Sequence, residues 1–208
     1  MSQTEAFILA GGASSRMGTD KSRLTLEGQS FIKRIAETLL EVTSKVSVVG
    51  HDSDDLRLDS IADIYPKWGA LGGVQTALSA CRAEWALVVA CDLPFVTPEL
   101  CKRLITLCES YDAVVPVQQD SRPQPLCALY KVDPCLVQAI QLIESGHRRP
   151  LDLIERVNTR RVEFLEVQDL PDADKFFVNI NTPEDYYEIS RTRVEGDNAP
   201  RRKNSPYD

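Results

Sequence analysis

The sequence predicts an α/β fold of the Rossmann-like class, with helices on both faces of a mostly parallel sheet. Two observations predict it: short apolar runs recur along the 208 residues, and amphipathic helical patterns separate several of them. Strands that alternate with helices form βαβ units, whose sheets are parallel and buried on both faces. We therefore expect three layers, α/β/α.

Strands are expected where apolar and β-branched residues cluster. The first run, residues 5–10, ends at two glycines, which indicates a buried strand that enters a tight loop. Ligands of such folds bind beyond the carboxyl ends of the strands, so we expect chemistry in the loops after Ala10, Cys91 and Val178. The remaining strands are expected at residues 46–50, 85–91, 113–117, 126–130 and 161–167, with a last strand ending at Val178.

Helices are expected where apolar residues follow a spacing of three to four. Residues 31–42 carry such a stripe. Thr97, Pro98 and Glu99 supply an N-cap, a proline at the first helical position and an acid in the first turn. Another helix is expected to start at residues 133–134 and to end near Gly146, and residues 182–185 cap a last one.

The composition excludes several classes of protein. The chain has 24 Lys and Arg against 31 Asp and Glu, a formal net charge of −7, and lacks the basic character of a nucleic-acid-binding protein. No apolar run approaches the roughly 18–20 residues of a membrane span. The apolar N-terminal stretch is too short for a secretory signal. We expect a cytoplasmic protein with neither a nucleic-acid nor a membrane partner.

The six cysteines show no C-x-x-C spacing, and most lie within apolar runs. We expect them to be reduced, buried and without a role in metal binding.

The length fits one domain with an appendage. Residues 1–190 are expected to form the domain. Residues 191–208 have few apolar side chains and carry five Lys and Arg against three Asp and Glu, so we expect a disordered tail.

The segment LAGGASSRMGTDK, residues 9–21, is the one that most clearly indicates chemistry. Glycines allow a backbone to approach an anion closely and present N–H groups to it. Arginine adds a planar fork for phosphate oxygens, and lysine adds a point charge. The segment differs from both a Walker A loop and a G-x-G-x-x-G fingerprint. It predicts a loop that binds the triphosphate of a nucleoside triphosphate, formed by Gly11, Gly12, Ser14, Ser15, Arg16 and Lys21.

This segment resembles the signature of molybdenum cofactor guanylyltransferases and their nucleotidyltransferase relatives. Four later blocks follow in the family's order: DIYP with GALGG, then ACDLP, PQPLCALY and VNINTPED. Together the blocks span residues 6 to about 187. The resemblance implies the fold of nucleotide-diphospho-sugar transferases. It also implies an enzyme that transfers GMP from GTP to Mo-molybdopterin, forming Mo-molybdopterin guanine dinucleotide and pyrophosphate.

The resemblance also assigns roles to residues. Arg16, Lys21 and Asp92 would be catalytic, and Asp92 would hold Mg²⁺. A carboxylate that follows a buried strand near a phosphate loop also suits such a hard cation on chemical grounds. Acceptor binding would fall to Asn179 and Asn181. The nucleotide would contact Leu9, Ala10, Gly11, Gly12, Ser14, Ser15, Arg16, Lys21, Asp63, Gly72 and Asp92, with Asp59 an alternative to Asp63.

Two positions depart from the family pattern. The loop at Gly50 lacks the asparagine that these guanylyltransferases often carry, and Ala70 replaces a proline. A cytidylyl-, adenylyl- or sugar-phosphate nucleotidyltransferase therefore remains an alternative, although the cytidylyl branch usually has alanine in place of Gly11. A non-catalytic nucleotide-binding carrier is the other alternative. The expected partners are GTP, Mo-molybdopterin and molybdoenzymes or other proteins of cofactor biosynthesis.

Overall fold

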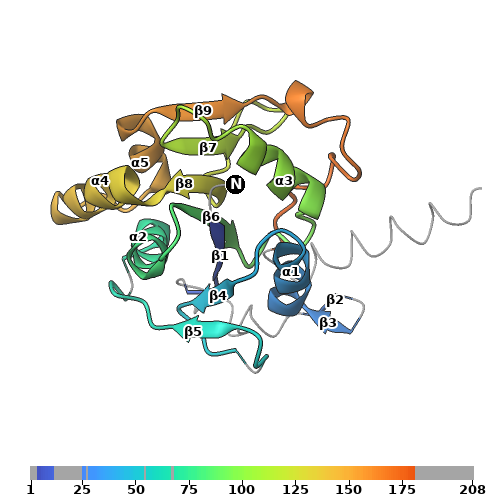
Figure 1. Ribbon diagram of the computed structural model, residues 1–208, viewed down its shortest axis with the longest axis horizontal. Helices are drawn as coiled ribbons and strands as arrows, with labels where there is room; N and C mark the ends of the chain where they lie inside the picture. The colour runs from blue at the N-terminus through green and yellow to red at the C-terminus, as the bar shows by residue number, and fades with distance from the viewer. Residues whose placement is uncertain (1–3, 12–24, 27, 54, 67, 181–208) are drawn as a thin grey trace, which may run out of the picture.

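The computed structural model of the protein describes residues 4–11, 25–26, 28–53, 55–66 and 68–180 (Figure 1). Within these residues, seven strands form one sheet in the order β5-β4-β1-β6-β8-β7-β9. The strands are β1 (Thr4–Leu9), β4 (Val46–Val49), β5 (Asp59–Ile61), β6 (Trp85–Ala90), β7 (Ala113–Pro116), β8 (Cys127–Lys131) and β9 (Thr159–Val162). All of them except β8 run in the same direction, which confirms the mostly parallel sheet.

Helices cover both faces of the sheet, as expected (Figure 1). They are α1 (Phe31–Leu40), α2 (Ala70–Ala80), α3 (Pro98–Thr106), α4 (Val132–Glu144) and α5 (Pro150–Arg156). Ala6 and Ile8 of β1 belong to the core cluster with α1 and α3, whereas Phe7 and Leu9 belong to the cluster with α2, α4 and α5. Side chains alternate across a strand, so the sheet separates two cores and the three-layer arrangement is confirmed.

Most predicted boundaries are confirmed to within one or two residues. The Thr97 hydroxyl accepts a hydrogen bond from the Leu100 amide, and Pro98 opens α3. Helix α4 ends at Glu144, and Gly146 adopts a φ of 85°. A short hairpin, β2 (Thr25–Leu26) with β3 (Gln29–Ser30), precedes α1. Four of the cysteines are buried, and all six are free: Cys81, Cys91, Cys101, Cys108, Cys127 and Cys135.

Two predicted strands are wrong. Strand β9 ends at Val162, and residues 164–166 form a 3₁₀ turn rather than continuing the strand to residue 167. The Glu163 and Glu166 side chains each accept the other's backbone amide, a capping box that bends the chain. Residues 171–177 form turns, and the Val178 amide donates to the Lys175 carbonyl, so no strand ends at Val178. The helix predicted at residues 182–185 lies outside the described residues.

The strand order reverses at β1. The chain leaves β1 for β4 and β5, then returns through α2 to β6 on the other side of β1. In open α/β sheets, ligands bind at such a switch point, beyond the carboxyl ends of the strands. Gly11, Gly50 and Asp92 follow β1, β4 and β6 at this edge of the sheet. No helix within the described residues is long and apolar enough to cross a membrane.

Candidate functional site

The ends of β1 and β4 meet through two glycines. A Cβ atom on Gly50 would lie 2.6 Å from the Cα atom of Gly11, and Gly50 has a φ of 80°. Both Ala10 and Gly11 donate their amides to the Val49 carbonyl, at 2.9 and 3.1 Å. Side chains are thus excluded on steric grounds at Gly50, and its departure from the family pattern has a structural reason.

Asp63 lies beside this glycine pair. Its Oδ2 atom is 3.6 Å from the position of a Cβ on Gly11. Its Oδ1 atom accepts hydrogen bonds from the Thr76 hydroxyl at 3.0 Å and the Tyr65 amide at 3.2 Å. One carboxylate oxygen is therefore fixed by the protein, and the other faces the end of β1. Asp59, the alternative to Asp63, lies within β5, is exposed and pairs with Lys45 at 3.7 Å.

Thr76 is a residue that the sequence did not single out. It lies on α2 with its side chain fully buried. Its hydroxyl donates to Asp63 and accepts the Ile64 amide, both at 3.0 Å. Both bonds orient the turn that carries Asp63. A threonine followed by an apolar residue in a helix gives no local signal of such a contact, because its partners lie 12 and 13 residues earlier.

Asp92 is joined to the segment that contains Asn179. The Ile180 amide donates to the Asp92 carbonyl at 3.1 Å. The Ile180 side chain is completely buried in a cluster with Phe31 of α1 and Phe95 of the loop after β6. Asn179, next to it, is exposed. The apolar cluster therefore holds the backbone around Asn179 close to the half-buried Asp92, and the role of Asn179 in acceptor binding stays a prediction.

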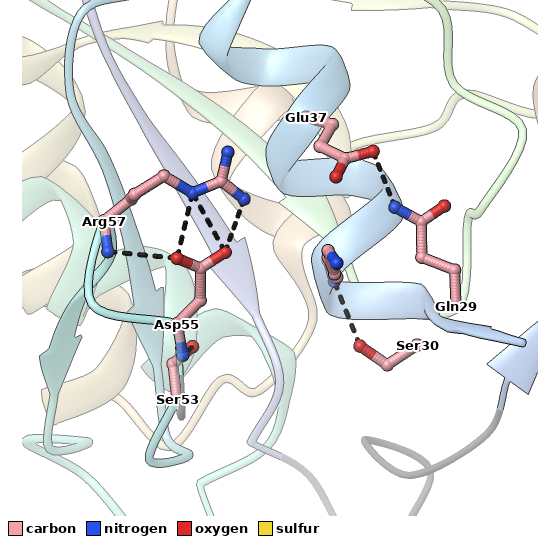
Figure 2. Close-up of polar contacts among 7 residues, drawn as sticks. Gln29, Ser30, Glu37, Ser53, Asp55 and Arg57 are labelled. Carbon is pink, nitrogen blue, oxygen red and sulfur yellow. Dashed lines mark hydrogen bonds and ion pairs between the residues drawn. The ribbon is translucent and has the colours of Figure 1, made fainter.

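A groove of about 890 Å³ adjoins the glycine pair. The start of α1 forms one wall, and residues 51–53 and 55–58 form the other. Figure 2 shows that polar groups pair within each wall: Gln29 donates to Glu37, and Arg57 donates to Asp55, each at 2.6 Å. The hydrogen bond from Arg57 holds the pKa of Asp55 at about 2.

Two of the predicted nucleotide contacts have packing roles in the structure. The Leu9 side chain is buried, and a Cβ on Gly73 would lie 3.4 Å from its Cδ1 atom. A Cβ on Gly72 would lie 3.1 Å from the Trp68 Cβ and 3.2 Å from the Tyr65 carbonyl oxygen. Leu9 thus packs against the first turn of α2, and Gly72 allows that turn to approach the chain at Tyr65 and Trp68. Gly12, Ser14, Ser15, Arg16, Lys21 and Asn181 lie outside the described residues.

The start of α2 is also held from the loop before α5. The Trp68 indole donates to the His147 carbonyl at 2.9 Å, and the Arg148 guanidinium lies 4.8 Å above its ring. Hydrogen bonds from Arg149 and His147 lower the pKa of the buried Asp152. Ala70 is the first residue of α2, the position that proline favours, so its replacement of proline leaves the turn intact.

Comparison with known proteins identifies the family. The model of the MobA-like NTP transferase domain matches residues 6–160. The chain belongs to this family. It is a nucleotidyltransferase, and the resemblance noted in the sequence is confirmed. Two relatives are named probable molybdenum cofactor guanylyltransferase. The one from Pelotomaculum thermopropionicum is 33% identical over 96% of both chains, and one from Clostridium perfringens is 32% identical over 93% of this chain and 99% of that protein.

Solved structures agree with this family. The molybdopterin-guanine dinucleotide biosynthesis protein A of Archaeoglobus fulgidus superposes with a TM-score of 0.78 at 25% identity, covering 92% of this chain and 99% of that one. The 4-diphosphocytidyl-2C-methyl-D-erythritol synthase of Anaerococcus prevotii shares the fold at 13% identity, with a TM-score of 0.67 over 93% and 99% of the two chains. The nucleotide-diphospho-sugar transferase fold is thus confirmed.

The glycine pair of this NTP transferase generates a stability prediction. Gly50→Ala adds a methyl group 2.6 Å from Gly11 in a left-handed conformation. Gly146→Ala meets the same conformational penalty, about 1–2 kcal/mol, but has nothing within 4 Å of the new Cβ. In urea denaturation, the free energy of unfolding should be lower for Gly50→Ala than for Gly146→Ala by about 1–3 kcal/mol, because the added methyl group overpacks the contact. Equal losses in the two variants would contradict the role given to this contact.

The Thr76 hydroxyl generates a second prediction. Thr76→Val keeps the shape but leaves the Ile64 amide and one lone pair of Asp63 without a partner, which costs about 1–3 kcal/mol. We expect the KM for the nucleotide to rise severalfold in a pyrophosphate-release assay. Thr76→Ser should restore it.

Thr43→Val is the matched control. The buried Thr43 hydroxyl donates to the Leu39 and Lys45 carbonyls, before β4 and away from the edge that carries Gly50. This variant should lose comparable stability with no change in the nucleotide KM. A KM that rises equally in both valine variants would show a general effect of destabilisation.

Proposed function

We propose that this nucleotidyltransferase acts in the cytoplasm and transfers GMP from GTP to Mo-molybdopterin, forming Mo-molybdopterin guanine dinucleotide and pyrophosphate. One observation carries the proposal: three sequence blocks far apart in the chain, around Gly11, Asp63 and Asp92, meet at one edge of the sheet. The names of the relatives, matched over nearly their whole lengths, support the choice of substrates.

The donor nucleotide is proposed to bind on the side of β1, β4 and β5. The half-buried Ala10 and the exposed Gly11 lead into the segment that carries Gly12, Ser14, Ser15, Arg16 and Lys21. In the proposal, amides of this segment and its two cations bind the triphosphate. The outward oxygen of Asp63 supports a contact with a donor group of the nucleoside, because an ionised carboxylate only accepts hydrogen bonds.

The donor set at this edge fits Mg²⁺. Asp92 offers a half-buried carboxylate, and the described residues hold no group of three or more His, Cys, Asp or Glu side chains around a common point. Magnesium is typically bound by one or two carboxylates together with substrate phosphates and water. We propose that Asp92 holds it. When bound, the ion would neutralise charge on the triphosphate.

The acceptor brings its own nucleophile, so the chain need not supply a base. An oxygen of the acceptor phosphate bonds to the α-phosphorus of GTP, and the bond from that phosphorus to the bridging oxygen breaks to release pyrophosphate. The protein must hold two anions together and stabilise charge on the leaving group. Arg16 and Lys21 are proposed to do so, while Asn179 and Asn181 orient the acceptor phosphate beside Asp92.

The substrates are tested by measuring pyrophosphate release with GTP, CTP and ATP, each with and without Mo-molybdopterin. We expect release only with Mg²⁺, GTP and Mo-molybdopterin together. Equal use of CTP and GTP would replace the guanylyl proposal by a cytidylyl one. Tight nucleotide binding without any release would support a carrier instead.

Asp92→Ala tests the proposed metal ligand. Loss of this carboxylate should lower kcat by at least about 100-fold, the lower end for removing a charge-stabilising group. Glu99→Ala is the control, because Glu99 is an exposed acid in the first turn of α3, only seven residues away. That variant should keep wild-type turnover. Mg²⁺-dependent activity of Asp92→Ala within about tenfold of the wild type would refute the assignment.

We further propose that residues 1–190 form the catalytic unit and that residues 191–208 are dispensable for it. A chain ending at Ser190 should keep its melting temperature and its guanylyl transfer within error. A clear loss of cofactor delivery to a molybdoenzyme or another cofactor-biosynthesis protein, with guanylyl transfer unchanged, would instead assign a docking role to Arg201, Arg202 and Lys203. Loss of guanylyl transfer itself would place the tail in the catalytic unit.

A further inference from the structure

A second hollow lies on the other side of Asp92. It has a volume of about 280 Å³ and lies between the loop after β7 and the segment that ends at Val178. Strand β7 runs parallel to β6, so both loops leave the sheet at the same edge. One strand, β8, separates them, which places the hollow about 10 Å along the edge from Asp92. Ile180, two residues after Val178, donates its amide to Asp92.

The described residues that line this hollow are chemically mixed and include no cation. Two half-buried aromatic rings, Phe164 and Phe177, form apolar walls, and Gln118 contributes an amide. Of its two carboxylates, Asp120 is paired with Arg122 at 2.5 Å. No hydrogen bond or ion pair joins Asp174 to another described residue. Among the described lining residues, none is Lys, Arg or His. The described lining therefore offers more partners to an uncharged ring with hydrogen-bond donors than to a phosphate.

A planar nitrogen heterocycle meets these conditions. Aromatic side chains pack against its faces. An ionised carboxylate accepts from two neighbouring N–H groups, and an amide both donates and accepts. The volume is near the lower limit for ligand pockets, so it suits a fused ring system but not a complete nucleotide.

We infer that this hollow binds the pterin-type ring of the acceptor, with Asp174 accepting from the ring's amino and N–H groups. This inference rests on the proposed function, which makes the acceptor a pterin that carries a phosphate. With the ring in the hollow and its phosphate at Asp92, the acceptor approaches from the side opposite to Gly11 and Asp63. Guanine presents the same amino and N–H edge, so the test must separate the two rings.

The test uses the full chain and 6-hydroxymethylpterin, whose fluorescence reports binding. Asp174→Asn should weaken pterin binding at least tenfold and raise the KM for Mo-molybdopterin similarly, while the KM for GTP stays within twofold. Asp172→Asn is the matched control. Asp172 lies in the same turn, but its carboxylate pairs with Lys175 at 2.6 Å and does not line the hollow. Asparagine tolerates the positive φ at this position.

Two results would overturn the inference. A raised KM for GTP in Asp174→Asn would assign the hollow to guanine, and unchanged pterin binding would assign it to neither ring. The proposed function is tested separately by the wild type. One outcome is that the wild type binds pterin through Asp174 and yet releases no pyrophosphate from GTP and Mo-molybdopterin. That result would support the pterin site in the hollow and refute the proposed guanylyl transfer.

Discussion

The close approach of Gly11 and Gly50 is the contact on which the candidate site depends. Because neither residue has a Cβ, the chain ends of β1 and β4 meet almost backbone to backbone, with the Val49 carbonyl accepting two amides from the β1 side. That proximity brings the outward oxygen of Asp63 within reach of the same point. A methyl group between the two backbones would separate three strand ends at once. The polar geometry of the donor side therefore rests on a steric constraint between two residues without side chains.

Apolar packing has the corresponding role on the other side of the site. The buried side chains of Phe31, Phe95 and Ile180 join the start of α1, the loop after Asp92 and the segment that carries Asn179. Arg34 adds a hydrogen bond of 3.0 Å from its Nε atom to the Pro94 carbonyl, which ties α1 to the same loop. The candidate site residues Asp92 and Asn179 thus lie on backbone that is held by a small hydrophobic cluster, separate from the two main cores. Packing behind the polar side chains of a site holds them to the accuracy that catalysis requires.

Sequence reasoning predicted the parts of this fold that have a strong local signal. Strand β6 is buried throughout and reads WALVVA, and α3 has a threonine cap followed by proline. Helix α2 was not predicted, because ALGGVQTALSA contains two glycines and is apolar around most of its surface, so no stripe stands out. The phosphate-loop residues and Asp92 were predicted from their types and order, and their roles stay predictions. Thr76 could not be found, since its role arises only when α2 packs against the turn at Asp63.

The arrangement along the sheet edge bears on how an acidic chain would bind the two anionic substrates of the proposed reaction. Asp63, Gly50, Gly11, Asp92 and the second hollow follow one another in the order of the strands. In the proposal, the hollow, whose described lining has no cation, takes the uncharged ring of the acceptor, and the acceptor's phosphate lies toward Asp92. Arg16 and Lys21 are the basic groups that the proposal assigns, with Mg²⁺, to both phosphates. Placing this proposed positive charge in one segment would favour the encounter of the two substrates at a single point, because both anions are attracted to the same groups.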